Sequence, residues 1–282
     1  MHIIAKMNSD TQLAYPSDGL LYVRVELPSP DCDVLAGVRW GEAGGLFSPA
    51  YWAAHCHLVA AKNASPQPHR LGRTLLEELA ACLLGGYGMS AELGLAAYSH
   101  VRDGGLLRFG VTAGDLEHAL SQPLEVTGRM MKYRYPRQRS VYLAGCIRAL
   151  EQSNVPTDAR ALRSYLCELP GIGPKTASWI VRNWLDSDEV AILDVHILRA
   201  MSYLKLVGHV AMPKDYERVE AVFLGFANAL GVRASILDAL MWQHMRRWGY
   251  LIDSKPRSIC RSVSRERRPT SRSQLLVNAG DD

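Results

Sequence analysis

A nine-residue run, Leu169 to Ala177, constrains the fold of this chain more than any other part of its sequence. The run reads LPGIGPKTA. Upstream, Thr157 and Asp158 can cap a helix, and the proline and glycine near the start of the run would end it. Pro174 suits the first position of a second helix, because the N–H that proline lacks would be unpaired there anyway. The run therefore predicts two helices joined by a short glycine hairpin, together spanning about residues 158–186.

The two glycines of the hairpin leave its backbone open to a ligand. Because Gly171 and Gly173 have no side chains, a DNA phosphate can approach the backbone N–H groups at the positive end of the second helix. We therefore expect Gly171, Ile172, Gly173 and Thr176 to bind DNA. A lone Gly-x-Gly would indicate only a turn between packed helices, but the length of the run and the aspartate that follows at Asp194 are more specific.

The hairpin, its lysine Lys175 and the downstream Asp194 resemble the helix-hairpin-helix DNA glycosylases, the superfamily of endonuclease III and the 8-oxoguanine DNA glycosylases. The resemblance is strongest over roughly residues 140–200. It implies a mainly α, two-lobed helical fold, with the target base of the DNA flipped into the cleft between the lobes. Lys175 falls on the family's catalytic lysine, which marks the bifunctional glycosylase/lyase branch, and Asp194 falls on its catalytic aspartate.

The reaction that this resemblance implies needs an amine and a carboxylate for chemical reasons. Breaking the bond between base and sugar builds positive charge on the sugar, which the carboxylate of Asp194 can stabilise. The amine of Lys175 can then form a Schiff base at the anomeric carbon, and β-elimination of the 3′ phosphate follows. Each residue also has a simpler interpretation, because Asp194 would serve as the N-cap of a helix over Val195–Leu204 and most helix lysines are solvated.

A glycine-rich segment, Leu84–Met89, departs from the pattern of the family. Proteins that this chain resembles usually have a polar loop there, which probes the duplex. Tyr87 or Met89 could fill the gap that a flipped base leaves. The glycines could instead make room for a bulky base, or form only a turn between helices.

The last long predicted helix carries candidate residues for a base pocket. Asp238, Trp242 and Gln243 combine an aromatic ring that can stack on a base with polar groups that can read its edge. Their Asp-x-x-x-Trp spacing resembles the smaller prokaryotic 8-oxoguanine glycosylases and favours an oxidised purine. A place in the core is an equally good interpretation of Trp242.

Basic and aromatic residues alternate at the entrance of a helix predicted over 136–152. Arg134 and Arg137, with Tyr133 and Tyr135 beside them, can hold a backbone phosphate and stack on an unpaired base. We expect Arg134 and Arg137 to bind DNA, with a solvated helix entrance as the alternative.

The composition fits a two-lobed enzyme. With 282 residues, 48% of them hydrophobic, the chain can bury one large or two smaller cores. It has no apolar run of about 18 residues and no signal-peptide pattern, so we expect a cytoplasmic protein without membrane contact. Its six cysteines are scattered, with no closely spaced four-cysteine run. We therefore expect no iron–sulfur cluster, no metal and no cofactor.

The chain divides into three parts. Residues 1–70 contain a β-type run, Leu20–Leu27, and a glycine-rich loop, and we interpret them as a small mixed N-terminal extension with short strands. Residues 71–253 are predicted to be the helical glycosylase core in two lobes. Its further helices are expected from Thr74, from Ser90, and over 136–152, 216–230 and 234–248.

Residues 254–282 are predicted to be a disordered basic tail. Between Ser254 and Ser273, seven basic side chains accompany one acidic side chain. Such a segment could attract DNA without sequence preference, or could only solubilise the terminus.

The sequence therefore predicts a bifunctional DNA glycosylase/AP lyase, acting as a monomer on double-stranded DNA that contains a damaged base, most readily 8-oxoguanine. One alternative keeps this chemistry but removes a hypermodified base of foreign (phage) DNA as a defence activity, with Gly85–Gly88 providing the space. The other is a non-enzymatic helix-hairpin-helix module that only binds DNA. The presence of both Lys175 and Asp194 argues against the latter, because phosphate binding needs neither.

Overall fold

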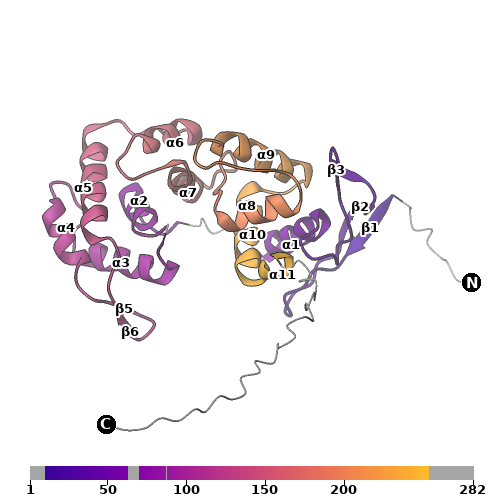
Figure 1. Ribbon diagram of the computed structural model, residues 1–282, viewed down its shortest axis with the longest axis horizontal. Helices are drawn as coiled ribbons and strands as arrows, with labels where there is room; N and C mark the ends of the chain where they lie inside the picture. The colour runs from indigo at the N-terminus through magenta and orange to yellow at the C-terminus, as the bar shows by residue number, and fades with distance from the viewer. Residues whose placement is uncertain (1–9, 63–69, 87, 254–282) are drawn as a thin grey trace, which may run out of the picture.

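Two separate hydrophobic cores organise the chain into two helical lobes (Figure 1). The computed structural model describes residues 10–62, 70–86 and 88–253. The first lobe contains α2 (Leu75–Leu84), α3 (Ala91–Asp103), α4 (Ala113–Leu120), β5 (Leu124–Val126), β6 (Arg129–Met131), α5 (Pro136–Gln152), α6 (Ala159–Cys167) and α7 (Pro174–Leu185). The second lobe contains β1 (Thr11–Ala14), β2 (Val25–Pro28), β3 (Asp33–Leu35), β4 (Val38–Arg39), α1 (Pro49–Lys62), α8 (Val195–Tyr203), α9 (Tyr216–Ala229), α10 (Ala234–Trp248) and α11 (Tyr250–Asp253). The predicted fold class, mainly α with two lobes around a helix-hairpin-helix unit, is confirmed.

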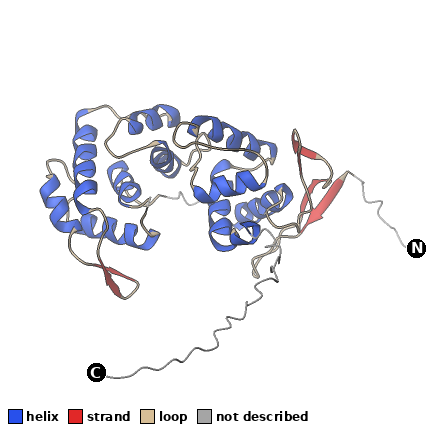
Figure 2. Ribbon diagram, in the orientation of Figure 1, coloured by secondary structure: helices blue, strands red, loops and turns tan. Residues whose placement is uncertain are grey.

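The described strands form three two-stranded antiparallel sheets at the edges of the lobes (Figure 2). β1 pairs with β2, with Thr11 opposite Pro28, and β3 pairs with β4 through an irregular register. β5 and β6 form a tight hairpin in the first lobe. Its two turn residues, Thr127 and Gly128, both have positive φ, as the favoured two-residue hairpin turn requires.

The helices begin where the sequence predicts capping residues. The side chains of Thr74, Ser90 and Asp158 accept hydrogen bonds from backbone N–H groups at the starts of α2, α3 and α6. α5 and α10 form with the expected bounds, and α9 ends one residue earlier than expected. Side-chain caps therefore mark the starts of α2, α3 and α6, whereas α5, α9 and α10 begin without a side-chain cap hydrogen bond.

The N-terminal region shares the second core with α8 to α11. Its strands pack with α1, a helix that the sequence pattern does not predict, and α1 packs against α10. α1 is apolar on most sides, with Ala50, Trp52 and Ala53 all fully buried, so it lacks the periodicity of a surface helix. Of the β-type run expected over Leu20–Leu27, only the part from Val25 onward forms a strand, β2.

Among the described residues, ion pairs cross from one lobe to the other at four places, one of which joins Arg246 of α10 to Glu92 of α3 at 3.6 Å. Arg182 of α7 binds Asp238 of α10 at 3.0 Å, and both side chains are buried. Arg163 of α6 pairs with Glu220 of α9. Arg233, just before α10, binds two aspartates just beyond α7. The Arg182–Asp238 pair is buried on both sides, and removing one partner of such a pair costs about 3–5 kcal/mol. The pairs of Arg233 and Arg246 are partly exposed and contribute less.

Two expectations fall outside the described residues: the basic tail over 254–282 and the loop residue Tyr87.

Within the part of the chain that the structure describes, no single helix is long and apolar enough to cross a membrane. α9 and α10 would pass that test together on length and composition, but the pair is bent by 103° at the break between them.

Candidate active site between the two lobes

The hairpin between α6 and α7 has the backbone conformation that its glycines predict. Gly171 has a φ of 77°, which favours glycine, and a Cβ atom there would collide with the ring of Tyr142 from α5. Ile172 is buried, and its N–H donates to the carbonyl of Leu169 at 3.2 Å. The N–H of Ile172 is thus already engaged within the hairpin, and its side chain anchors the turn on the first lobe.

The start of α7 is open to a ligand. Its N-cap, Gly173, has no side chain to cap the helix, and no atom lies within 4 Å of the place where a Cβ would stand. Pro174 takes the first helical position, as predicted. The N–H groups of Lys175 and Thr176 lie in the first turn, where a helix supplies no acceptors of its own. This positive end of α7 can receive a phosphate beside Lys175.

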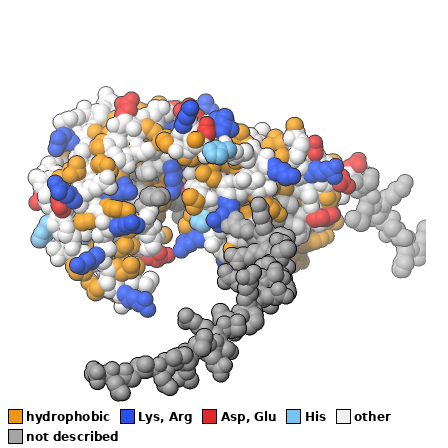
Figure 3. Space-filling model, viewed as in Figure 1, with side chains coloured by type: hydrophobic (Ala, Val, Ile, Leu, Met, Phe, Trp, Pro, Cys, Tyr) orange, Lys and Arg blue, Asp and Glu red, His pale blue; other side chains and the backbone are white. Residues whose placement is uncertain are grey.

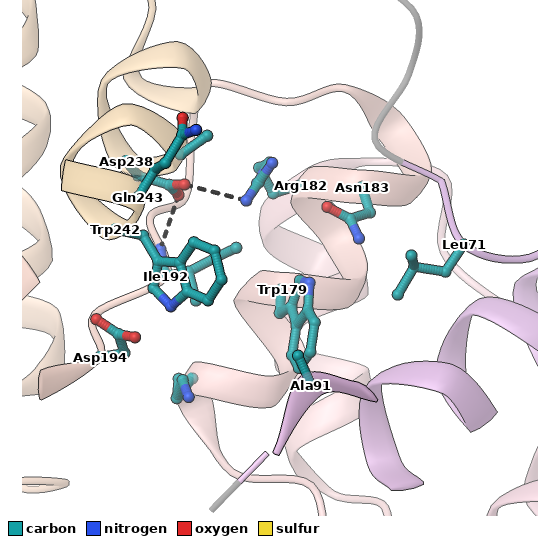
Figure 4. Close-up of a pocket in the computed structure, with 12 residues that line it drawn as sticks. Leu71, Ala91, Trp179, Arg182, Asn183, Ile192, Asp194, Asp238, Trp242 and Gln243 are labelled. Carbon is teal, nitrogen blue, oxygen red and sulfur yellow. Dashed lines mark hydrogen bonds and ion pairs between the residues drawn. The ribbon is translucent and has the colours of Figure 1, made fainter. Parts of the chain in front are cut away.

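Lys175 and Asp194 both line a pocket of about 440 Å³ between the lobes. Figure 4 shows Asp194 with other lining residues of both lobes. The surface is hollowed between the lobes, and lysine and arginine side chains lie over the first lobe and beside the hollow (Figure 3). The pocket is lined by Leu71, Ala91, Lys175, Trp179, Arg182, Asn183, Ile192, Asp194, Asp238, Ala239, Trp242 and Gln243. The candidate base-pocket residues of α10 therefore share one pocket with the two candidate catalytic residues. Its volume is typical of a site for a small molecule.

Asp194 is the N-cap of α8, as one interpretation of the sequence predicts. Its Oδ1 accepts the N–H of His196 at 2.8 Å and the N–H of Ile197 at 3.0 Å. Both capping bonds use Oδ1, so the cap leaves Oδ2 available to a ligand. Capping and a role in the pocket are therefore compatible in one side chain.

The extended segment before Asp194 is held by two buried side chains of α9. The hydroxyl of Tyr216 donates to the carbonyl of Ala191 at 2.7 Å and accepts the N–H of Leu193 at 3.3 Å. Glu220 accepts the N–H of Ala191 at 2.9 Å. Because backbone groups outside helices and sheets need other partners, these bonds fix the path of the chain that leads to Asp194. We call Tyr216 and Glu220 the α9 brace.

Asp238 lies in the pocket wall with both carboxylate oxygens engaged. One oxygen accepts from Arg182 at 3.0 Å and the other accepts the N–H of Ile192 at 3.3 Å (Figure 4). Burial raises the pKa of Asp238 to about 6, although the Arg182 guanidinium opposes that shift. Asp238 thus holds Arg182 and Ile192 in place at the edge of the pocket.

Two tryptophans from different lobes line the pocket. Trp179 follows Lys175 by one helical turn, and Trp242 comes from α10 (Figure 4). Trp242 is 38% exposed, and the guanidinium of Arg246 lies over its ring at 5.1 Å. Aromatic faces of this kind are surfaces on which an unstacked base can stack.

Sequence reasoning missed three lining residues of α7: Trp179, Arg182 and Asn183. They follow Lys175 by four, seven and eight positions, which is the spacing of one helix face. Extending the helical period from Lys175 is the signal that could have found them.

The glycine-rich loop after α2 lies against one of the predicted DNA-binding arginines. Gly86 and Gly88 both have positive φ, so the loop conformation itself favours glycine. Arg134 is exposed and donates to the carbonyl of Gly88 at 3.4 Å, and Arg137 is exposed at the start of α5. Met89 is half-buried against the first lobe.

Among the residues that the structure describes, no group of three or more His, Cys, Asp or Glu side chains could hold a metal ion.

Lys175 and Asp194 come from different lobes and line one pocket, beside the start of α7, which is open to a phosphate. This arrangement is the one that defines the helix-hairpin-helix DNA glycosylases. Within that class, the helix-hairpin-helix model of 8-oxoguanine DNA glycosylase matches residues 67–232, more than half of the chain. The chain belongs to this family.

Individual relatives agree with the family match. The 8-oxoguanine DNA glycosylase/AP lyase of Thermoplasma acidophilum is 30% identical over 172 residues, which are 60% of this chain and 78% of that protein. The protein of the same name from Metallosphaera sedula is 31% identical over 118 residues, 39% of this chain and 57% of that one. The crystal structure of the 8-oxoguanine DNA glycosylase of Thermotoga maritima matches with a TM-score of 0.56 and 26% identity, covering 71% of this chain and 97% of that chain.

Proposed function

We propose that this protein is a bifunctional DNA glycosylase and AP lyase that excises 8-oxoguanine from double-stranded DNA. The observation that carries the proposal is that Lys175 and Asp194, from different lobes, line one pocket beside the open start of α7. An amine and a carboxylate at one site are what lysine-dependent base removal needs. The relatives named as 8-oxoguanine DNA glycosylase/AP lyases support the same reaction and substrate.

Binding begins with the damaged nucleotide turned out of the duplex. Its base enters the pocket and stacks on Trp179 and Trp242, while a flanking phosphate approaches the N–H groups of Gly173 and Thr176. Arg134, beside the glycine-rich loop, holds the DNA backbone nearby. Extrusion costs a few kcal/mol and is easiest for damaged or mispaired bases, which favours the lesion.

Lys175 and Asp194 then share the chemistry. As the bond from C1′ to the base breaks, its electron pair leaves with the base, and the carboxylate of Asp194 stabilises the positive charge on the sugar. Nζ of Lys175 donates its lone pair to C1′, and opening of the sugar ring, with a proton passing from Nζ to O4′, gives a Schiff base. Removal of a proton from C2′ then expels the 3′ phosphate by β-elimination, and water releases Lys175. Because the protein, the DNA and water supply every group, we expect no cofactor.

We expect the enzyme to act as a monomer. Borohydride trapping tests the covalent step, because reduction of the Schiff base joins the enzyme to the DNA permanently. We expect the wild-type protein to form an adduct with an 8-oxoguanine duplex and with an abasic duplex. Lys175→Gln should form neither adduct, because an amide has no nucleophilic lone pair. Lys214→Gln, at an exposed position before α9, is the matched control and should behave as the wild type.

A panel of duplexes tests the substrate. Oxidised pyrimidines, uracil and a bulky modified cytosine are compared with 8-oxoguanine in the same sequence. An adduct with the bulky cytosine alone would mean that the enzyme removes a modified base of foreign DNA and does not repair 8-oxoguanine. The absence of any adduct, even with the abasic duplex, would reject the lyase and leave a monofunctional enzyme or a DNA-binding module.

A further inference from the structure

The amide of Asn183 lies in the wall of the pocket. Asn183 lies on α7 two turns after Lys175, is 2% exposed and lines the pocket. Its Nδ2 donates to Oε1 of Glu78 at 2.8 Å. Its Oδ1 is buried and has no hydrogen-bond partner among the described residues. In Figure 4 the amide nitrogen lies on the side of Leu71 and the oxygen on the side of Arg182.

Glu78 prevents this amide from turning over. Glu78 is fully buried on α2, and its Oε2 accepts the N–H of Leu71 at 2.6 Å and the N–H of Gly72 at 2.9 Å. Its Oε1 accepts from Asn183 and from the thiol of Cys82 at 3.6 Å. Both oxygens of Glu78 thus act as acceptors, so a reversed amide would place two acceptor oxygens together with no proton between them. The unpaired atom of the Asn183 amide in the pocket wall is therefore an acceptor.

Arg182 contributes an unpaired donor to the same pocket wall. Its Nε is buried and also lacks a partner within the described part of the chain, while its Nη2 is held by Asp238 at 3.0 Å. The pocket wall thus carries one unpaired acceptor and one unpaired donor on consecutive residues. Because nearly all buried polar groups in folded proteins are hydrogen-bonded, this pair fits a ligand with the complementary groups.

We propose that Oδ1 of Asn183 accepts the N7–H of 8-oxoguanine, that Nε of Arg182 donates to its O8, and that this pair distinguishes the lesion from guanine. Oxidation at C8 turns N7 into an N–H donor and adds a carbonyl oxygen beside it. Guanine has an acceptor at N7, which would face Oδ1 without a proton between them. Stacking on Trp179 and Trp242 suits any base, so the discrimination falls to the polar pair. The inference rests on the proposed function and names the base edge that the same pocket reads.

Equilibrium DNA binding tests the discrimination. In a Lys175→Gln background, which stops the chemistry, affinity for an 8-oxoguanine duplex is compared with affinity for the same duplex carrying guanine. We expect Asn183→Leu to lower this preference about 10-fold or more, because it removes the acceptor. Asn228→Leu, at an exposed position of α9, should keep the preference. Equal loss of affinity for both duplexes would overturn the proposal, because Asn183 would then read an edge common to both bases or only support the fold.

Glu78→Gln provides a second test of the same amide. The N–H groups of Leu71 and Gly72 would hold the new side-chain oxygen at the position of Oε2 and direct its NH2 toward Asn183. The amide of Asn183 would then turn over and present a donor to the pocket, which suits the N7 acceptor of guanine. We expect the preference for 8-oxoguanine to fall by about the same factor of 10, with affinity for guanine rising. An unchanged preference would overturn the proposed orientation.

An abasic duplex separates failure of this inference from failure of the proposed function. It has no base at the site, so borohydride trapping on it reports the fold and Lys175 without base reading. With Lys175 intact, Asn183→Leu should still form the abasic adduct but excise 8-oxoguanine about 10-fold more slowly or worse. Parallel loss on both duplexes would assign Asn183 a structural role and overturn the inference. No adduct from the wild type on either duplex would reject the proposed function itself.

Discussion

Gly171 and Gly173 lie two positions apart in the hairpin, but each lacks a side chain for a different physical reason. Gly171 has a φ of 77° and lies against the ring of Tyr142. Gly173 has a φ of −99°, which any residue adopts, and a side chain there would meet no atom within 4 Å. Backbone conformation and packing thus explain Gly171, whereas the approach of a phosphate explains Gly173 under the proposed function.

Alanine at each glycine should separate folding from DNA binding. Gly171→Ala is expected to lower the free energy of unfolding by about 1–3 kcal/mol, because it combines a strained φ with a collision. Gly173→Ala should change stability by less than about 0.5 kcal/mol, but weaken DNA binding about fivefold or more, because its methyl group lies where the phosphate approaches. Chemical denaturation and fluorescence anisotropy with a labelled duplex measure the two effects. Equal destabilisation by both variants would contradict this assignment.

Among the elements, α9 contributes to the site without lining the pocket. Its brace residue Tyr216 holds the carbonyl of Ala191 and the N–H of Leu193 through one hydroxyl. The next residue after Leu193 is Asp194. A small displacement of a catalytic group lowers the reaction rate much more than it lowers binding, so a residue that supports the segment can matter for catalysis.

Tyr216→Phe should therefore affect base excision more than DNA affinity. We expect single-turnover excision of 8-oxoguanine to slow by about 10- to 100-fold, because two backbone groups lose their partner and Asp194 shifts. Affinity for the duplex should stay within about twofold of the wild type, a difference of under 0.5 kcal/mol. Tyr165→Phe is the control, since its hydroxyl contacts Ser153 at 2.8 Å and Tyr165 does not line the pocket. Excision at the wild-type rate would mean that the α8 cap alone positions Asp194.

The elements also differ in how well their sequences predict them. α5, α9 and α10 combine helical periodicity with clear ends, and they form within one residue of the expected bounds. α1 is buried on most sides, so its apolar residues show no periodic face, and the sequence pattern does not predict it. The strand β2 begins only at Val25, because the first residues of the apolar run lie in the connection from β1, where Asp18 accepts the N–H groups of Leu20 and Leu21.

At the scale of the whole molecule, the second lobe is tied together by the contact between α1 and α10. The hydroxyl of Tyr51 and Nδ1 of His244 lie 2.8 Å apart, and the rings of His55 and Trp248 pack against His244. Burial lowers the pKa of His244 to about 4, and the charges of His55 and Arg247 add to the shift. The pKa of His55 is also lowered by burial.

These shifts set the sign of a pH effect on stability. An unfolded histidine titrates near about 6.5. As the pH falls from about 6.5 toward 4, the unfolded chain binds a proton that the folded His244 resists, so the stability that neutral His244 contributes is lost over that window. Asp238, with its pKa raised to about 6, acts in the opposite direction, because the folded state takes up its proton first.

His244→Gln should isolate the histidine contribution. We expect the difference in Tm between the wild type and this variant to be largest near pH 7 and to shrink as the pH approaches about 5, because only the wild type has the buried imidazole. Asp238 is present in both proteins, so its effect cancels in the difference. Thermal denaturation across this range measures the trend, with His118→Gln at an exposed position of α4 as the control. A difference that does not vary with pH would contradict the assignment.

The glycine hairpin and the cap at Asp194 were recognisable in the sequence because their signals are local, whereas the role of Lys175 followed from the resemblance to the helix-hairpin-helix glycosylases. Proline at a helix start, glycine at a positive φ and a capping aspartate each depend on the nearest few residues. The shared pocket was not recognisable in this way, because it forms only when two cores pack and buried ion pairs cross between them. The orientation of the Asn183 amide depends on Glu78, which lies 105 positions away in the chain. Side-chain direction follows from neighbours in space, and the packing of the two lobes chooses those neighbours.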